Sequence, residues 1–572
     1  MHSIFKNLSC LLLAGPLVAL GQGERYIPLN LTDLGAFQQA PANWSIKQDM
    51  SVLPKNGAKV KLINGSGTLI GSPGKALNTK LQASDLSLEF EFMLSPGAQG
   101  TLTLPGGATI LLSDSYLQNQ IAATTIGFSS IFPTQNAAKA PGLWQKLELT
   151  YDANLDNLPN TSRINTLKIN GVMVSEAVYI PHKTEDETGP IGFEVHTGTI
   201  AFRNMGYQLL VDKQTLSLLE LSYQVYGDNW DSPSREKLEK EGKTQILTQE
   251  VASGLKNFHL NYSGKMQVTD AGEYTFSSRY NGPAFRLEID GKPVINSQAS
   301  SSQDVVTGTV DLSTGMHDFK LYYARFPWRG PALGLEVRKA GIRSYPLTAL
   351  SSLPQPAPKP YMEVNPGERP EMIRSFILLP EEKAKRTKCI SVGGPQGWNY
   401  SIDLDRGALL QAWKGPFANV TEMWYERGEP QLLEPAGMKV LLSGKSSVAN
   451  LKDDNSVWPD SSDIRFLGYH LDASGNPRFR YSVAGHPVTD QIISRGDGLF
   501  RTITSSTTRS NPLYVLLAQS KNIIEVEKGL YQIDGQYYIE IKKPIKPVIR
   551  KNMDGQELII PLVGDASYKI FW

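Results

Sequence analysis

Short runs of alternating apolar and polar residues, separated by glycine-containing turns, recur along almost the whole chain. In residues 86–94, for example, two phenylalanines alternate with two glutamates. Successive side chains of a strand point to opposite faces, so this alternation predicts strands with one buried face. Asn-Gly at 170–171 and Asp-Gly at 290–291 each lie between two such runs, which indicates tight hairpins. Long helical periodicity is rare, and the sequence therefore predicts an all-β protein.

With 572 residues, the chain is too long for a single hydrophobic core. The proline-rich segment 351–360 has the composition of a semi-rigid spacer, and the strand pattern changes near residues 211–219. We therefore expect three β-sandwich or jelly-roll domains in tandem after a signal peptide. The expected limits are 1–21 for the signal peptide, 22–211, 212–350 and 361–572 for the domains, and 351–360 for the linker.

The first residues have the layout of an export signal. Lys6 supplies a positive charge, residues 11–20 form an apolar core, and small residues flank a cleavage position before Gln22. An apolar stretch of this length is too short to cross a bilayer, and no later stretch is long enough to do so. We therefore expect an exported protein that does not span the membrane and resides in the periplasm, on the outer surface or in the medium.

The charge balance and the cysteine count exclude several classes of function. Lys and Arg total 57 against 56 Asp and Glu, so nucleic-acid binding is not expected. Cys389 is the only cysteine outside the signal peptide, and no internal disulfide is expected. Asp403 and Asp405 lack the other ligands of a calcium loop and are interpreted as part of a polar hairpin. We predict no metal and no cofactor.

The segment 189–204 has the pattern of two short strands joined by a turn at Gly198. Alternation turns its phenylalanines towards a core and turns Glu194, His196 and Arg203 the other way. An acid, an imidazole and a guanidinium on one side of a sheet suit a site for a sugar or a polar metabolite. A solvated sheet face has the same composition, and the residues leave both interpretations open.

Residues 27–210 resemble the 3-keto-disaccharide hydrolase domain, a concanavalin-like jelly roll of exported bacterial proteins. The resemblance extends over the whole first domain at family-like spacing. The matching pieces are Trp44, Asp85-Leu86, Glu91-Phe92, Trp144, Asn170-Gly171, Gly189-Pro190-Ile191-Gly192, His196, Gly198 and Phe202-Arg203-Asn204.

That resemblance implies cleavage of sugars that carry a ketone at carbon 3. The ketone acidifies the neighbouring hydrogen, so an acid/base pair and an oxyanion stabiliser can expel the aglycone. On this basis we predict His196 and Glu194 as catalytic residues. Glu91, Arg203 and Asp114 are predicted to bind substrate, with Arg203 steadying negative charge. A cross-strand ion pair between Glu91 and Arg203 is the alternative interpretation and is equally open. We expect the two glutamates, the histidine and the arginine to meet in one hollow.

Two departures from the family pattern bear on activity. Ala98-Gln99-Gly100 stands where family members usually carry Asn-Ser-Gly, and the strand at 107–112 lacks the usual inward Glu and Gln. Two polar contributors are therefore missing from the expected cleft. These departures favour a first domain that has lost its chemistry, whereas the intact acid, imidazole and guanidinium favour an active one.

Residues 212–350 resemble the protective-antigen-type module, which is often a glycan-binding domain, through Ala-Gly-Glu-Tyr-Thr-Phe at 271–276 and Ile-Asp-Gly-Lys at 289–292. Tyr280-Asn281-Gly282-Pro283 stands where calcium-dependent versions carry an Asp pair, so no calcium is predicted. Trp328 is predicted to stack on a sugar face, and the equally open alternative is a loop tryptophan that covers a neighbouring domain. His317 is interpreted as structural, and residues 361–572 resemble no family dependably.

The sequence therefore predicts an exported carbohydrate-active protein with an oligosaccharide or glycoside, including a cell-surface glycan, as its partner. The first hypothesis is a glycoside-cleaving first domain with an appended glycan-binding module. The alternative is a non-catalytic protein that binds glycan or protein at the cell surface. Seven Asn-x-Ser/Thr sites outside the signal peptide also leave eukaryotic secretion open.

Overall fold

The computed structural model describes most of the chain from residue 26 to residue 572. Within the described part the chain is almost entirely β, which confirms the predicted fold class, and its single α-helix is the one-turn α1 (Thr421–Trp424). Short 3-10 turns occupy Pro105–Gly107, Glu250–Ala252 and Leu350–Ser352. The description leaves out residues 1–25, 129–130, 156–157, 184–186, 228–236, 301–304, 326–329, 331, 354–359, 381, 426–430, 461–462, 507–512 and 542–545.

The first unit is a two-layer sandwich. Its strands are β1 (Ile27–Pro28), β2 (Trp44–Ser51), β3 (Lys61–Gly71), β4 (Leu77–Asn78), β5 (Leu86–Leu94), β6 (Gln99–Thr103), β7 (Thr109–Ser113), β8 (Gly127–Phe128), β9 (Gln145–Asp152), β10 (Thr161–Ile169), β11 (Val172–Pro181), β12 (Gly192–Thr197) and β13 (Ile200–Leu209). One sheet has the order β11-β10-β9-β5-β13-β3-β2 with β1 paired to β13, and the other has the order β4-β12-β6-β7-β8. Phe90 and Phe202 of the larger sheet meet Phe193 of the smaller one edge-on, at ring-centroid distances of 6.1 and 5.1 Å.

The second unit is a sandwich of a six-stranded and a four-stranded sheet. Its strands are β14 (Leu216–Gly227), β15 (Lys237–Thr244), β16 (Phe258–Val268), β17 (Gly272–Tyr280), β18 (Gly282–Ile289), β19 (Lys292–Ser300), β20 (Val306–Leu312), β21 (Gly315–Ala324), β22 (Leu333–Lys339) and β23 (Ile342–Pro346). The sheet orders are β15-β14-β16-β21-β18-β19 and β20-β17-β22-β23. The buried apolar residues of this unit form a core of their own.

The third unit contains four sheets. Its strands are β24 (Glu363–Val364), β25 (Glu371–Ile377), β26 (Arg386–Gly393), β27 (Trp398–Asp403), β28 (Ala408–Lys414), β29 (Ala418–Asn419), β30 (Glu434–Pro435), β31 (Met438–Leu441), β32 (Val448–Asn450), β33 (Ile464–Leu471), β34 (Pro477–Val483), β35 (His486–Arg495), β36 (Gly498–Ser505), β37 (Leu513–Ser520), β38 (Ile523–Glu527), β39 (Leu530–Ile533), β40 (Tyr537–Ile541), β41 (Val548–Asn552), β42 (Gly555–Leu562) and β43 (Gly564–Phe571). The sheets run β24-β29-β30, β25-β26-β27-β28-β31, β32-β37-β42-β41 and β33-β34-β35-β36-β43-β40-β39-β38.

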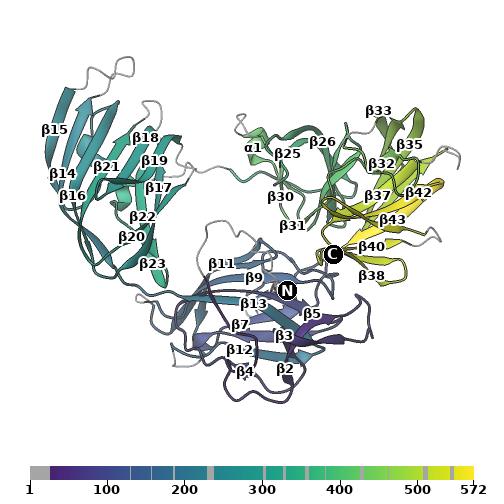
Figure 1. Cartoon of the computed structure of the whole chain (residues 1–572), viewed down its shortest axis with the longest axis horizontal. Helices are drawn as coiled ribbons and strands as arrows, with labels where there is room; N and C mark the ends of the chain where they lie inside the picture. The colour runs from purple at the N-terminus through teal and green to yellow at the C-terminus, as the bar shows by residue number, and fades with distance from the viewer. Residues whose placement is uncertain are drawn as a thin grey trace, which may run out of the picture.

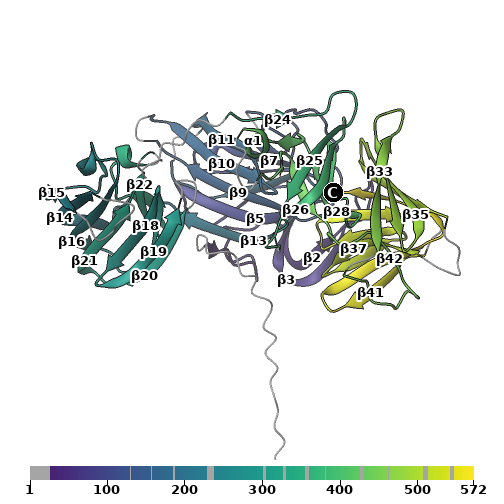
Figure 2. The same cartoon turned by 90° about the horizontal axis from the view of Figure 1, so that it is seen from above.

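The second and third units lie at opposite ends of the first, as both overall views show (Figures 1 and 2). The third unit packs closely enough that its buried apolar residues and those of the first form one continuous cluster. At this junction the Tyr538 hydroxyl donates to the Pro141 carbonyl at 3.1 Å, and Gln532 Nε2 donates to the Gly142 carbonyl at 2.9 Å. Gly142 has φ of 80°, and its lack of a side chain permits this close approach.

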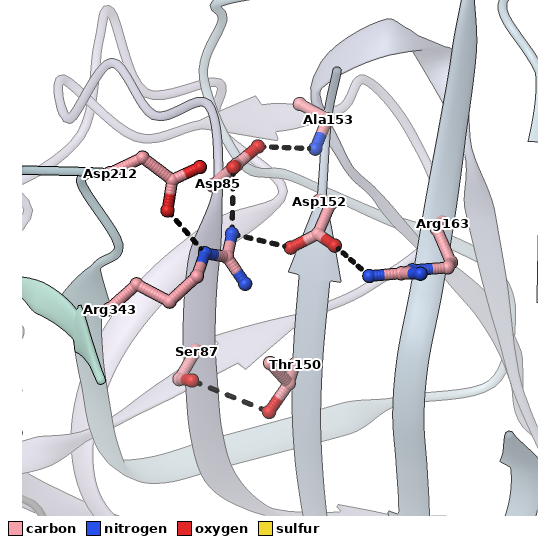
Figure 3. A network of polar contacts seen from close by, with 8 residues as sticks. All are labelled: Asp85, Ser87, Thr150, Asp152, Ala153, Arg163, Asp212 and Arg343. Carbon is pink, nitrogen blue, oxygen red and sulfur yellow. Dashed lines mark hydrogen bonds and ion pairs between the residues drawn. The ribbon is translucent and has the colours of Figure 1, made fainter. Parts of the chain in front are cut away.

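One arginine carries the side-chain contacts drawn between the second unit and the first (Figure 3), beside backbone hydrogen bonds that join Val211 to Gly341 and to Arg343. Arg343 on β23 donates from Nη2 to Asp85 Oδ2 at 2.8 Å and to Asp152 Oδ1 at 2.7 Å. Its Nε donates to Asp212 Oδ1 at 2.8 Å. Arg163 binds the other oxygen of Asp152 at 2.9 Å, so the contact is a network and not a single pair. Of the helices described, none is both long and apolar enough to cross a membrane.

Candidate functional site

The predicted catalytic pair lies on the outer face of the smaller sheet of the first unit. Glu194 and His196 both belong to β12, and Phe193 and Val195 between and beside them are buried in the core. His196 Nδ1 is 3.9 Å from Glu194 Oε1, and His196 Nε2 is 3.3 Å from Thr101 Oγ1 on the neighbouring strand β6. The side chains of His196 and Glu194 are 39% and 43% exposed, so this face is open to solvent.

Glu91 and Arg203 form a second pair on the outer face of the larger sheet. They are directly opposite each other on β5 and β13, and Arg203 Nε donates to Glu91 Oε2 at 2.6 Å. The guanidinium carbon of Arg203 lies 3.9 Å from the ring centroid of Trp144. This arrangement is a cross-strand ion pair that also makes a cation–π contact.

The expectation that these four groups meet in one hollow is wrong. The two pairs lie on the outer faces of different sheets, with Phe90, Phe193 and Phe202 packed between the sheets. The turn at Gly198 explains the error, because β12 and β13 do not pair with each other as a hairpin would. The chain crosses there from one sheet to the other, so alternation carries Arg203 to the far side of the sandwich from His196.

Asp114 lies at the end of β7, on the same edge of the sandwich as the end of β12. Its Oδ2 accepts the Gly97 N–H at 2.8 Å, and the Gly97 carbonyl in turn accepts the Thr197 hydroxyl at 2.9 Å. Burial raises the pKa of Asp114 above its ordinary value, although the Gly97 bond opposes the shift. Asp114 also lines a hollow of about 390 Å³ with Tyr116 and Pro141.

Tyr116 links this hollow to the third unit. Burial, followed by the charges of Asp114 and Asp497, raises the pKa of Tyr116 to about 12. Asp497 belongs to the third unit, so the hollow of Asp114 lies beside the junction of the first and third units. Asp114 is connected to the end of β12 through Gly97 and Thr197, and its hollow reaches the third unit through Tyr116.

Lys139 is a residue near these groups that the sequence analysis did not single out. Its side chain is buried, and Nζ donates to Gln536 Oε1 of the third unit at 2.6 Å. Burial lowers the pKa of Lys139 to about 8, and the charge of Glu91 opposes that shift. The signal in the sequence is a lone lysine within Ala-Ala-Lys-Ala-Pro-Gly at 137–142, which has the composition of a buried segment.

The remaining candidates have structural partners or lie beyond the description. Trp328 falls outside the described residues. His317 Nδ1 contacts Asp290 Oδ2 at 2.7 Å, and its Nε2 contacts the Ser313 carbonyl at 2.8 Å. Asp403 is held by Arg386 at 3.2 Å. Within the part of the chain that the structure covers, no three or more His, Cys, Asp or Glu side chains gather as a metal site would require.

The chemistry open to the β12 face is proton transfer. An imidazole beside a carboxylate is a candidate general base, and the 3.9 Å between His196 Nδ1 and Glu194 Oε1 places these two side chains next to each other. The Thr101 hydroxyl is the neutral hydrogen-bonding group next to it. Glu91 and Arg203 form an ion pair with each other on the other sheet, so neither side chain contributes to the β12 face.

Several solved structures match parts of the chain, and no curated protein matches it. A "Putative glycosyl hydrolase" from Parabacteroides distasonis is 17% identical, with 32% of this chain and 100% of that chain covered and a TM-score of 0.24. A second one from the same organism is 11% identical, with 30% and 89% covered and a TM-score of 0.19. The GH31 alpha-xylosidase from Xanthomonas citri is 11% identical, with 56% and 36% covered and a TM-score of 0.22.

A family model gives the more specific result. It begins at residue 32, a few residues into the first unit, and it ends within β13. All four ionisable residues of the two pairs, together with Asp114 and Lys139, lie inside the matched stretch. Residues 32–206 match the model of the 3-keto-alpha-glucoside-1,2-lyase-like domain, which supports a carbohydrate-related function for this part of the chain.

Proposed function

We propose that this chain is an exported carbohydrate-active protein whose first unit cleaves 3-keto glycosides at the outer face of β12. The observation that carries the proposal is that the family-model match over residues 32–206 includes the His196–Glu194 contact. His196 is the general base, and Glu194 orients its imidazole.

The reaction proceeds by proton abstraction next to the ketone. His196 takes the hydrogen from carbon 2, and the electron pair of that C–H bond forms an enolate with the oxygen at carbon 3. Collapse of the enolate forms a double bond between carbons 1 and 2 and breaks the bond from carbon 1 to the glycosidic oxygen. The leaving oxygen takes up a proton from the imidazolium, and water then adds to the unsaturated sugar. We assign stabilisation of the negative charge on the enolate oxygen to the Thr101 hydroxyl, because Arg203 lies on the other sheet.

The second unit is proposed to hold glycan, as its resemblance to the protective-antigen-type module implies. Binding there raises the effective concentration of substrate at the first unit. Residues 1–21 are proposed to be removed on export, and mass spectrometry of the secreted protein would then find Gln22 at the mature N-terminus.

The second candidate function is non-catalytic binding of glycan or protein at the cell surface. The observation that favours it is the separation of the two ionisable pairs, which places the Arg203 guanidinium on the other sheet from the β12 face. Under this alternative His196 and Glu194 belong to a solvated sheet face.

The test is incubation of the purified chain with a 3-keto-disaccharide and with its unoxidised parent. The proposal expects free sugar from the keto form only, with the rate reduced about 100-fold or more in His196→Ala. Glu194→Gln is expected to show a smaller loss. Glu176→Gln, an exposed change on β11, is the matched control and retains the full rate. A folded protein that releases no sugar but binds glycan would establish the second candidate.

A further inference from the structure

The second unit has a large hollow on the outer face of its six-stranded sheet. The hollow measures about 840 Å³ and lies over β15, β14, β16, β21 and β18. Five strands at about 4.8 Å spacing span about 19 Å. The sheet face under the hollow, called the floor below, is wide enough for several units of an oligomeric ligand. It is wider than a single small metabolite needs.

Strand register places polar side chains in two parallel rows across this floor. In one row, Gln224, Asn261, Tyr322 and Arg286 are consecutive cross-strand partners. In the adjacent row the partners are Ser222, Ser263, Lys320 and Glu288. Amides, hydroxyls and guanidinium groups arranged in this way offer hydrogen-bond donors and acceptors at regular intervals.

Aromatic rings border the first row. Tyr226 stacks on His259 with ring centroids 5.1 Å apart, and His259 lies 5.6 Å from Tyr322 on the next strand. The His259 ring is buried and supports its neighbours, and of the three rings Tyr322 is the one that lines the hollow. The rings therefore follow the same direction as the polar rows, from β14 to β21. Flat apolar surface beside regularly spaced hydrogen-bonding groups suits a ligand that has apolar ring faces and many hydroxyls.

The charges on the floor nearly cancel. Arg286, Lys243 and Lys320 are opposed by Glu241 and Glu288, and Arg286 Nη1 lies 3.4 Å from Glu288 Oε1. A surface for a polyanion carries a clear excess of cations, since binding there depends on neutralising the repeated charges. The balance on this face favours an uncharged ligand.

We propose that this sheet face binds a neutral oligosaccharide laid across the strands from β15 to β18. The inference rests on the carbohydrate function proposed above and gives the second unit a site on its sheet that does not depend on Trp328. Tyr322 supplies the ring face, and Asn261 and Gln224 supply hydrogen bonds to hydroxyls.

The test is calorimetric titration of the full chain with α-1,4-linked and β-1,4-linked glucose hexamers, and with a galacturonic acid hexamer as the charged comparison. We expect one neutral hexamer to bind and its Kd to rise about ten-fold in Tyr322→Ala, as for a central interface residue. Asn261→Ala is expected to weaken binding less than Tyr322→Ala. It tests the same sheet face independently if Tyr322→Ala does not fold. Thr275→Ala, on the outer face of the opposite sheet, is the matched control and leaves the Kd unchanged.

Two further comparisons separate this inference from the proposed cleavage. His196→Ala leaves binding of the hexamer unchanged, and Tyr322→Ala leaves release of sugar from a soluble 3-keto-disaccharide unchanged. The inference is overturned if neither neutral hexamer binds, if both floor variants bind like wild type, or if the galacturonate hexamer binds more tightly with strong salt dependence. If the protein binds a hexamer at this face but releases no sugar, the binding site is supported and only the proposed cleavage is refuted.

Discussion

Arg343 offers the sharpest test of how the units are held together. Its guanidinium bridges Asp85 and Asp152 of the first unit and Asp212 between the units (Figure 3). The Asp152 side chain is only 4% exposed, and that of Asp85 is 17% exposed. We choose Arg343→Met as the perturbation, because methionine keeps much of the apolar stem and removes the charge.

The magnitude follows from the charges that the substitution leaves behind. Removing one partner of a buried ion pair costs about 3–5 kcal/mol, since the other charge remains desolvated. The Arg343 side chain is 30% exposed, and solvent screening reduces the expected loss to about 2–3 kcal/mol. Two neighbouring carboxylates, Asp85 and Asp152, then face each other with Arg163 as the remaining cation.

The assay is denaturant unfolding of the full chain, combined with limited proteolysis of the connection at residues 210–215. Arg343→Met is expected to lower the unfolding midpoint and to expose that connection to protease. Lys265→Met removes an exposed pair with Asp318 in the same unit and is the matched control, with no measurable change. Asp85→Asn is expected to restore part of the loss in the Arg343→Met background, because an amide oxygen still accepts the Ala153 N–H.

The pH dependence supplies a second readout with a defined sign. Burial raises the pKa of Asp85, and the charge of Asp152 adds to the shift while Arg343 opposes it. Loss of Arg343 raises this pKa further, so the folded variant holds a proton that the unfolded chain has released. The loss of unfolding free energy in Arg343→Met, relative to wild type, should therefore be smaller near pH 4 and larger near pH 7. Equal midpoints for Arg343→Met, Lys265→Met and wild type across this range would refute the reasoning.

Three further predictions concern other parts of the chain. The hydrogen bond to Asp290 raises the pKa of His317 in the folded protein. The stabilisation from this pair is therefore complete below about pH 6.5 and is lost as the pH rises through the folded pKa. The difference in unfolding free energy between wild type and His317→Gln should be larger at pH 6 than at pH 8.5, and an equal difference at both pH values would contradict the prediction. Gly142→Ala at φ of 80° places a Cβ close to the Val52 carbonyl oxygen of the first unit and 2.6 Å from the Tyr538 hydroxyl of the third. The backbone strain alone should cost about 1–3 kcal/mol, and the two close contacts should add to it and loosen the third unit in proteolysis. Gly171→Ala meets no atom within 4 Å and shows the backbone cost alone. Burial raises the pKa of the Cys389 thiol to about 12, so a disulfide reagent should titrate it only after unfolding, and rapid reaction of the folded protein would disprove this.

Local pattern determined the strands of this protein. Alternation in 86–94 predicted β5 and the faces of Glu89 and Glu91, and Asn170-Gly171 predicted the β10–β11 hairpin. These outcomes depend on neighbours within a few residues, because side-chain direction repeats every two residues and a turn requires specific dihedral angles. The same pattern predicted the all-β class, and it requires no knowledge of which strands pair.

Only the tertiary structure decided which strands share a sheet and which units touch. β12 and β13 follow each other in sequence yet lie in different layers, so Glu194 and Arg203 point away from each other across a common core. Arg343 meets Asp85 across 258 positions of sequence, and Lys139 meets Gln536 across 397. Nothing near these residues in the chain specifies such partners, because sheet pairing and unit docking are set by burial of whole surfaces. The sequence by itself therefore identified the residues that could do chemistry, and the packing of the sheets determined which of them are neighbours.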